Sequence, residues 1–350
     1  MDAQKGKMRS CYLAVLLLVC PWPAQGQHVS QNIDEELTRL YNKQAFSGSV
    51  LVAKDGKIIY RKNVGLADRE HRISIGPTTK FELASLSKVF TAVLVLQLVE
   101  SGKINLYAPI SEYVPELTRS DSGNITIHHL LSHTSGIQDF VGLNCLFAEW
   151  TRKEFMEGVN KTPIVFKAGS RFQYASSTYV LLRFIIEQVT GRSYEQNILD
   201  RIFKPLGMTD SGIVKNNEIL PDRAMGYVGT PEGYINAPAI ANHEIFIGAA
   251  SVYSTATDLL KFDQALYTQS LLSAASKEKM FTIVEAPYGY GWFISDDGTR
   301  GKVVSHGGDV FGYTSLIERR LKDKTLILIL GNQQSIDREA ILKLLDKMLR

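Results

Sequence analysis

The sequence predicts an α+β fold in which one antiparallel sheet is assembled from strands at both ends of the chain. Segments rich in β-forming residues occur between residues 48 and 63 and again between 290 and 330, whereas the pattern from about 81 to 200 is mostly helical. Amphipathic helices are expected near both termini, where they would cover one face of the sheet. The helical region would be inserted between the strands, so we expect residues 27–350 to form one domain with two lobes.

The N-terminal strands are predicted to form a hairpin. Gly48–Ala53 and Lys57–Asn63 have β-strand character, and Asp55-Gly56 between them is a strong signal for a two-residue turn. Ahead of this hairpin, apolar residues recur at helical spacing among polar ones, at Ile33, Leu37, Leu40 and Tyr41. The pattern predicts an amphipathic helix followed by two strands.

The C-terminal part is predicted to return to strands. Tyr290–Ser295, Lys302–Ser305, Tyr313–Glu318 and Thr325–Leu330 are short β-rich segments separated by Gly and Asp. The last segment, Ile336–Leu349, has its apolar residues on one side of a helix. These strands and the N-terminal hairpin would share one sheet.

Residues 1–26 have the pattern of a secretory signal peptide. Basic residues near the start precede the apolar run Tyr12–Val19, and Ala24-Gln25-Gly26 puts small residues at the two positions that signal peptidase reads. The apolar run is shorter than the roughly 20 residues that a membrane-spanning helix needs. Lipid attachment at Cys20 is the alternative, and Val19 disfavours it. We therefore expect a secreted or periplasmic protein that is cleaved after Gly26 and has no stable membrane span.

Composition and charge exclude several classes of function. With 45% hydrophobic and 21% charged residues, the 350-residue chain is typical of a globular protein. The formal net charge of +3 includes a net +2 from the signal segment, so the mature chain carries +1 and gives no basis for binding nucleic acid. Cys145 is the one cysteine left after cleavage, which excludes an internal disulfide. Asn124 and Asn160 begin N-glycosylation patterns, which matter only in a host that glycosylates exported proteins.

Ser85 is the candidate nucleophile. It precedes Thr91–Val99, an almost wholly apolar stretch typical of a buried helix, and Lys88 lies on the same helical face three residues later. Serine is favoured as the N-terminal cap of a helix. A serine hydroxyl needs a base to become a good nucleophile. A lysine that loses solvation beside the positive end of a helix dipole shifts toward its neutral form, which can accept that proton.

The Ser-x-x-Lys pattern alone leaves a purely structural role open, because common residues produce it by chance. A second copy, Ser276–Lys279, has charged neighbours and no apolar helix behind it, so we expect a surface turn there. Two further segments support the first copy. One contains Tyr174-Ala175-Ser176, and the other contains His306-Gly307-Gly308-Asp309 at the end of a predicted strand.

These three elements, in this order, resemble those of the serine β-lactamase and penicillin-binding superfamily, specifically its class C, D-alanyl-D-alanine carboxypeptidase and esterase branch. The resemblance covers roughly residues 30 to 350 and implies a β-lactamase-like fold. Connecting segments are also similar to this family, namely His129–Ile137, Pro205–Met208, Gly248–Leu259 and Tyr288–Trp292.

The resemblance implies catalysis through an acyl-enzyme. Ser85 would attack the acyl carbonyl, and Lys88 would keep the neighbouring groups in the right protonation state. Tyr174, as a phenolate favoured by Lys88 and His306 or as a hydrogen-bonded relay, would be the base and would then protonate the leaving group. Water would attack the acyl-enzyme, and no metal or organic cofactor is required.

The resemblance also implies the groups that would bind the substrate, a small molecule or a peptide. The backbone N–H groups of Ser85 and Asp309 would form the oxyanion hole. Gly307 and Gly308 would let the strand backbone approach the substrate without an intervening side chain.

Two positions depart from the commonest β-lactamase pattern. His306 stands where β-lactamases usually carry the lysine that holds the substrate carboxylate, and histidine offers only a conditional charge. Ser176 stands where asparagine is usual, and a hydroxyl cannot replace both groups of an amide. We therefore expect a D-Ala-D-Ala carboxypeptidase, a D-aminopeptidase or a small-ester esterase, with weak β-lactamase activity at most. The alternative is a non-catalytic protein on the same fold that binds peptidoglycan peptides or another partner.

Two other site types are disfavoured. His128, His129 and His133 could be interpreted as a metal cluster, but no nearby glutamate completes a zincin arrangement. The chain also contains no Gly-x-Ser-x-Gly elbow, which argues against an α/β-hydrolase.

Overall fold

The computed structural model describes residues 24–119, 121–139, 150–238, 243–296 and 298–349. The signal-peptide prediction falls mainly on residues 1–23, which lie outside the described residues, as do Cys20 and Cys145. Across the described ranges, no helix is both long enough and apolar enough to cross a membrane.

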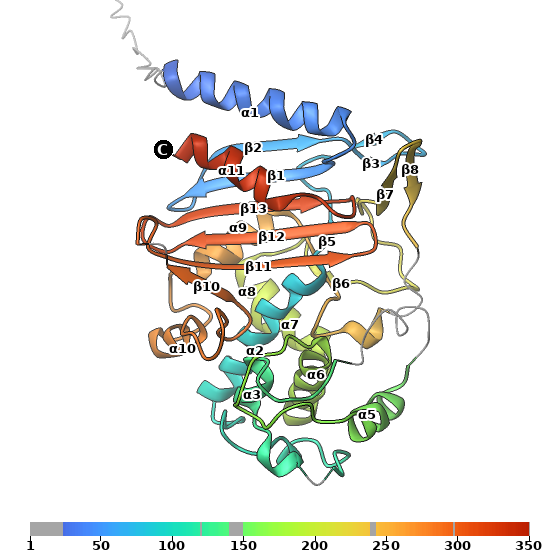
Figure 1. Cartoon of the computed structure of the whole chain (residues 1–350), viewed down its shortest axis with the longest axis vertical. Coiled ribbons are helices and arrows are strands. Elements are labelled where there is room, and N and C mark those ends of the chain that lie inside the picture. The colour runs from blue at the N-terminus through green and yellow to red at the C-terminus, as the bar shows by residue number, and fades with distance from the viewer. Residues whose placement is uncertain (1–23, 120, 140–149, 239–242, 297, 350) are drawn as a thin grey trace, which may run out of the picture.

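The largest element is a six-stranded antiparallel sheet with the strand order β10-β11-β12-β13-β1-β2 (Figure 1). In chain order, its strands are β1 (Gly48–Lys54), β2 (Lys57–Val64), β10 (Phe293–Asp296), β11 (Lys302–Val310), β12 (Tyr313–Arg320) and β13 (Thr325–Gly331). Strand β1 pairs with β2 on one side and with β13 on the other. This pairing confirms that the sheet is built from both ends of the chain.

The hairpin turn follows the prediction, whereas two strand boundaries differ from it by three residues or more. Asp55 and Gly56 have φ angles of 47° and 77°, the left-handed geometry that a two-residue Asp-Gly turn requires. Strand β10 begins three residues later than expected, because Gly291 turns the chain with a φ of 78°. Strand β11 continues to Val310 instead of stopping at Ser305, since β12 pairs with it throughout the glycine pair.

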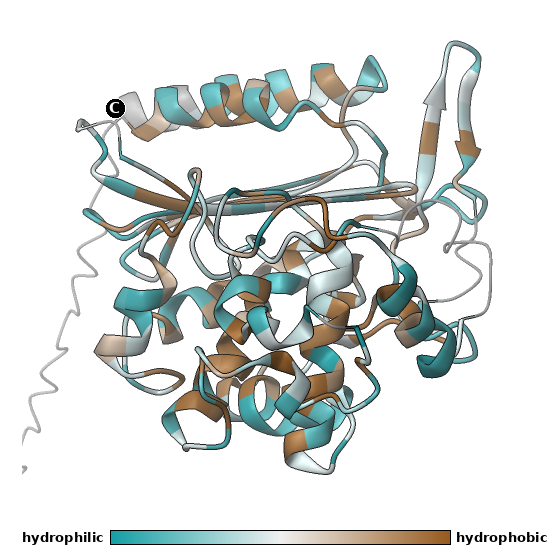
Figure 2. Ribbon diagram, turned by 60° about the horizontal axis from the view of Figure 1, so that its bottom comes forward, coloured by the Kyte–Doolittle hydropathy of each residue, from teal (hydrophilic) through white to brown (hydrophobic). Residues whose placement is uncertain are grey.

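Two helices cover one face of the sheet. Helices α1 (Ala24–Asn42) and α11 (Arg338–Leu349) lie side by side on this outer face (Figures 1 and 2). Their apolar sides pack on alternate residues of the central strands to form a separate small core. Its fully or nearly fully buried members include Ile33, Leu37, Ile341 and Leu345 of the helices and Val50, Val52, Ile327 and Ile329 of the strands.

The opposite face of the sheet packs on the helical part of the chain, where the larger core lies (Figure 2). Its central helix is α2, which is buried on every side from Lys88 to Leu96, as its apolar sequence predicts. The α-helices on this side are α2 (Lys88–Glu100), α3 (Ile127–Leu131), α5 (Arg152–Lys161), α6 (Ser176–Thr190), α7 (Tyr194–Ile198), α8 (Lys204–Leu206), α9 (Ala256–Ala265) and α10 (Ala274–Met280).

Shorter elements join the two layers. A three-stranded sheet contains β5 (Phe81–Glu82), β9 (Val252–Ser254) and β6 (Gly212–Ile213). Two hairpins pair β3 (Leu66–Asp68) with β4 (Ile73–Ser74) and β7 (Tyr227–Thr230) with β8 (Gly233–Asn236). Strand β5 leads into the 3-10 turn η1 (Ala84–Ser87) and then into α2, so Ser85 lies where the large sheet meets the helical lobe.

Candidate active site

Ser85 lies in the 3-10 turn η1 rather than at the cap of α2. Ala84 before it has a φ of 49°, a left-handed conformation that costs a non-glycine residue about 1–2 kcal/mol. The turn is tied to β9, because Val252 N–H donates to Ser87 Oγ at 2.9 Å and Val252 O accepts from Leu83 N at 2.9 Å. Neither η1 nor α2 has a side-chain cap, so the expectation that Ser85 caps the helix was wrong. Its hydroxyl is instead available to Lys88.

The ammonium group of Lys88 is completely buried and has three acceptors. Nζ lies 3.1 Å from Ser85 Oγ, 3.1 Å from the carbonyl oxygen of Ala249 and 3.4 Å from Ser176 Oγ. Burial lowers the pKa of Lys88 to about 7, and the charge of Asp139 partly opposes this shift. Near neutral pH the amine is therefore present in both protonation states, and its neutral form can accept the Ser85 proton.

Tyr174 lies against the same two groups. Its hydroxyl is hydrogen-bonded to Ser85, and its ring centre is 4.9 Å from Lys88 Nζ. Burial raises the pKa of Tyr174, and the hydrogen bond to Ser85 opposes this only in part. The phenol is therefore neutral at physiological pH, which favours the relay over the phenolate among the two roles that the resemblance implied. The ring of His133 packs against it, with 4.3 Å between the ring centroids.

His306 is buried and uncharged. Its Nδ1 lies 2.6 Å from Gly307 O, and because a carbonyl can only accept, Nδ1 carries the proton. Nε2 is then free to accept from the hydroxyl of Tyr288 at 3.4 Å. Burial, aided by the charge of Lys88, lowers the pKa of His306 to about 3. The conditional charge expected at this position is therefore not available near neutral pH.

The backbone of β11 approaches the Ser85 turn through its two glycines. The ladder between β10 and β11 ends at Ser305, so β11 pairs beyond that point with β12. A methyl group on Gly308 would lie 2.1 Å from Leu83 O and 3.0 Å from the backbone nitrogen of Ser85. A methyl group on Gly307 would instead lie 2.6 Å from a guanidinium nitrogen of Arg338. Both glycines thus make room for protein groups, and their role toward substrate stays a prediction, as does the oxyanion role of the Asp309 N–H.

Asp139 is a site residue that sequence reasoning missed. Its carboxylate accepts hydrogen bonds from Ser176 N at 2.9 Å, Ser177 N at 3.1 Å and Ser177 Oγ at 2.6 Å, and so caps the start of α6. The residue before the helix, Ala175, has no side chain that could do this. Position 139 follows closely on the segment His129–Ile137, which was the one available signal.

The histidines weighed as metal ligands have separate partners. His128 Nδ1 is 2.6 Å from Tyr290 Oη, and His129 Nδ1 is 3.2 Å from Thr126 Oγ1. His133 Nδ1 accepts from the Ala175 N–H at 3.2 Å. Within the described part of the chain, no three metal-ligating side chains gather into a site.

The second Ser-x-x-Lys copy is helical, so the expectation of a surface turn was wrong. Ser276 and Lys279 lie in α10, and Ser273 caps that helix through the Ser276 N–H. Ser276 is 7% exposed and is hydrogen-bonded to Ser273, which is not one of the candidate site residues.

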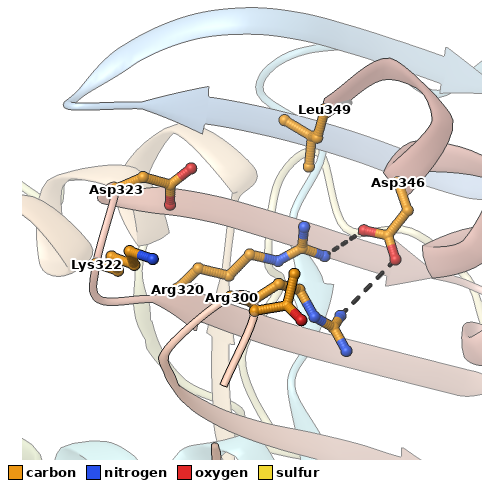
Figure 3. Close-up of a pocket in the computed structure, with 7 residues that line it drawn as sticks. Arg300, Arg320, Lys322, Asp323, Asp346 and Leu349 are labelled. Carbon is orange, nitrogen blue, oxygen red and sulfur yellow. Dashed lines mark hydrogen bonds and ion pairs between the residues drawn. The ribbon is translucent and has the colours of Figure 1, made fainter. Parts of the chain in front are cut away.

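A pocket of about 800 Å³ lies beside the end of β12, where Arg320 pairs with Val303 near the start of β11 (Figure 3). Arg320 and Arg300 both pair with Asp346, the second at 3.7 Å. Asp323 pairs with Lys54 at 3.4 Å. Each of these charged side chains has an ion-pair partner, and the lining contains no serine or cysteine nucleophile.

The site contains a buried lysine that is hydrogen-bonded to a serine, and it lies between an antiparallel sheet and a helical lobe. This is the arrangement of a serine acyl hydrolase. Residues 29–346 match the family model described as Beta-lactamase, and the chain belongs to this family. It is 32% identical to penicillin-binding protein 4* of Bacillus subtilis strain 168 over 92% of this chain and 77% of that protein.

Solved structures agree with this assignment. The penicillin-binding protein of Bacillus halodurans superimposes with a TM-score of 0.78 and 26% identity over 91% of this chain and 98% of that one. An octameric penicillin-binding protein homologue from Pyrococcus abyssi gives a TM-score of 0.80 and 28% identity over 91% and 76% of the two chains. The superfamily and the fold predicted from the sequence are thereby confirmed.

Proposed function

We propose that this protein hydrolyses small esters or D-amino-acid peptides through an acyl-enzyme on Ser85, with weak β-lactamase activity at most. One observation carries the proposal. Lys88 Nζ lies 3.1 Å from Ser85 Oγ, and burial lowers the pKa of Lys88 to about 7. A base matched to neutral pH is what a serine nucleophile needs.

In acylation, the neutral amine of Lys88 takes the hydroxyl proton of Ser85 while Oγ attacks the acyl carbon. The electron pair displaced from the carbonyl is stabilised by the N–H groups of Ser85 and Asp309. Tyr174 donates its phenolic proton to the leaving group and recovers a proton from the Lys88 ammonium. Breakage of the scissile bond leaves the acyl group as an ester on Ser85.

In deacylation, water attacks this ester and gives its proton to the neutral amine of Lys88. The same oxyanion donors stabilise the charge that develops. When the ester bond breaks, Ser85 Oγ leaves and takes the proton back from Lys88. The product acid departs, and the side chains return to their starting protonation states.

The neutral state of His306 bears on the substrate class. With a pKa of about 3 and both ring nitrogens engaged, His306 offers no charge to a substrate carboxylate at neutral pH. Ser176 adds one hydroxyl, which already accepts from Lys88 at 3.4 Å. Both features support an esterase or a D-aminopeptidase over a carboxypeptidase, which must bind the carboxylate beside the scissile bond.

A labelling and turnover experiment tests the proposal. The purified protein is treated with a fluorophosphonate probe and assayed on p-nitrophenyl acetate, D-alanine p-nitroanilide, acetyl-D-Ala-D-Ala, its C-terminal amide and nitrocefin. We expect labelling and turnover in the wild type and in Ser276→Ala, the matched change in the second Ser-x-x-Lys copy, and neither in Ser85→Ala. Labelling that survives Ser85→Ala would overturn the assignment of the nucleophile. Stable labelling of Ser85 with no turnover of any substrate would favour the non-catalytic binding protein.

We also propose export of residues 27–350 as a single domain to the periplasm or the medium. The support is the basic, apolar and small-residue pattern of residues 1–26. N-terminal sequencing of the exported protein should begin at Gln27. A lipid-modified Cys20 at the mature N-terminus would replace this proposal with membrane anchoring.

A further inference from the structure

An arginine of the C-terminal helix holds the strand that carries the proposed oxyanion donor. Arg338 begins α11, on the outer face of the sheet (Figure 1). Its Nη1 donates to Ser315 O at 3.0 Å and to Gly308 O at 3.4 Å. Its Nη2 donates to Asp309 Oδ2 at 2.7 Å. One guanidinium therefore contacts both β11 and β12 beside the predicted oxyanion hole.

The sequence of β11 leaves space for this contact. A methyl group on Gly307 would lie 2.6 Å from Arg338 Nη1, so the guanidinium lies directly over the α-carbon of Gly307. The second nearest atom, at 3.2 Å, also belongs to that guanidinium, and the nearest atom outside Arg338 would be Ser315 O at 3.4 Å, an ordinary contact. An alanine at position 307 would therefore displace the mobile end of the arginine and leave the strand backbone in place.

The contact continues through the sheet to the nucleophile. Gly308 and Ser315 are paired across β11 and β12. On the inner face, Ser315 Oγ donates to Leu83 O at 2.7 Å. Gly308 lies so close that its missing Cβ would be 3.0 Å from the backbone nitrogen of Ser85. Two of the three residues that Arg338 binds, Gly308 and Ser315, are thus also the two that contact the Ser85 turn on the inner face.

We propose that Arg338 is a positioning residue that fixes the backbone of Gly308 and Asp309 relative to Ser85, so that the two oxyanion donors converge. The inference rests on the proposed function. Productive sites need geometry held within about 0.5 Å, and a small shift of β11 would separate the two N–H groups. The planar guanidinium binds three acceptors in a fixed arrangement, which the point charge of a lysine cannot reproduce.

Stability alone does not account for these contacts. The side chains of Arg338 and Asp309 are 29% and 53% exposed, and an ion pair at that exposure contributes little to stability. A positioning role predicts instead that loss of the guanidinium affects the transition state more than substrate binding or folding. Because Lys88 is untouched, the pH midpoint of activity should not move.

The test compares Arg338→Lys, Arg338→Ala and Gly307→Ala in the full chain, with p-nitrophenyl acetate as substrate. In each variant we expect kcat to fall about 10- to 100-fold while KM changes less than about 3-fold, since removal of a whole oxyanion donor costs about 100- to 1000-fold. Arg338→Lys should not rescue activity. The double variant Arg338→Ala/Gly307→Ala should have a kcat no lower than that of either single alanine variant, because both changes disturb the same contact. Lys343→Ala, an exposed change on the same helix, should behave as the wild type.

Unchanged kcat in Arg338→Ala and Gly307→Ala would overturn the inference, as would full rescue by lysine. If Arg338→Ala fails to fold, the other two variants decide, because they keep a residue at position 338 that reaches the sheet. The fluorophosphonate experiment keeps the two proposals apart. If the wild type is labelled at Ser85 and substitution of Arg338 leaves kcat unchanged, only the positioning role is refuted. If the wild type is not labelled, both proposals are refuted.

Discussion

Lys88 Nζ and Ser85 Oγ lie 3.1 Å apart, and the remaining acceptors of that ammonium group are Ala249 O and Ser176 Oγ. These are neutral acceptors, so among the described residues no carboxylate in direct contact compensates the buried charge. Burial therefore dominates the pKa of Lys88 and lowers it to about 7. The same pair of residues then determines both how the site reacts and how the protein's stability depends on pH.

The first prediction concerns the acid limb of activity. Below the Lys88 pKa of about 7, the ammonium form cannot take the Ser85 proton, so kcat/KM should rise with pH with a midpoint near that value. The measurement is kcat/KM for p-nitrophenyl acetate from about pH 5 to about pH 9, corrected for hydrolysis in the presence of Ser85→Ala. A midpoint near the ordinary lysine value would contradict the role of Lys88 as base.

Asp139→Asn should move that midpoint to lower pH. The Asp139 carboxylate raises the pKa of Lys88, so removing its charge lets the ammonium lose its proton more easily. Asparagine keeps one oxygen that can accept from the start of α6, which limits the loss of stability to about 1 kcal/mol. Glu339→Gln, which removes an 84%-exposed carboxylate, is the control and should leave the profile unchanged. A shift of the midpoint to higher pH in Asp139→Asn would contradict the argument that this carboxylate raises the pKa of Lys88.

Lys88→Met should abolish turnover and stabilise the fold. The folded-state pKa of Lys88 is lowered from 10.5 to about 7, so between these values the unfolded chain binds a proton that the folded protein does not. The free energy of unfolding of the wild type should therefore rise with pH across this window. The variant should lack this pH dependence. We expect a gain of about 1–4 kcal/mol at neutral pH by urea denaturation. Lys343→Met on the surface should give no such gain, and a destabilised Lys88→Met would refute the argument.

Tyr174→Phe tests the proton relay. The change keeps the ring that packs 4.3 Å from His133 and removes the hydroxyl bonded to Ser85. We expect kcat to fall about 100- to 10,000-fold at unchanged stability, because general acid–base catalysis contributes that much. Tyr107→Phe, at a side chain 64% exposed, is the matched control. Near-wild-type turnover in Tyr174→Phe would remove the phenol from the mechanism.

The large features of the fold followed from sequence because they depend on local patterns. Asp55-Gly56 determines its hairpin through backbone conformation, and the apolar character of Thr91–Val99 on every side requires a buried helix. The three-residue spacing of Ser85 and Lys88 brings the two side chains together whatever surrounds them. Such features need no knowledge of distant residues.

The rest of the site depends on contacts that no local pattern records. Asp139 reaches Ser176 from 37 positions away, and Arg338 reaches Gly308 from 30. Ala249 contributes a backbone carbonyl, which every residue possesses. The charge state of His306 could not be predicted from sequence either, because burial rather than residue type lowers its pKa to about 3.

Gly308→Ala should lower both the stability of the protein and its kcat. The new Cβ would lie 2.1 Å from Leu83 O and 3.0 Å from Ser85 N, so either β11 or the nucleophile turn must move. Overpacking of this kind costs about 1–3 kcal/mol of stability, and the displaced oxyanion donors should reduce kcat about 100-fold or more. Gly76→Ala is the control, because a methyl group there would meet nothing within 4 Å. Thermal unfolding and acylation rates of the two variants decide the matter, and equal rates would mean that β11 and Ser85 are not coupled through Gly308.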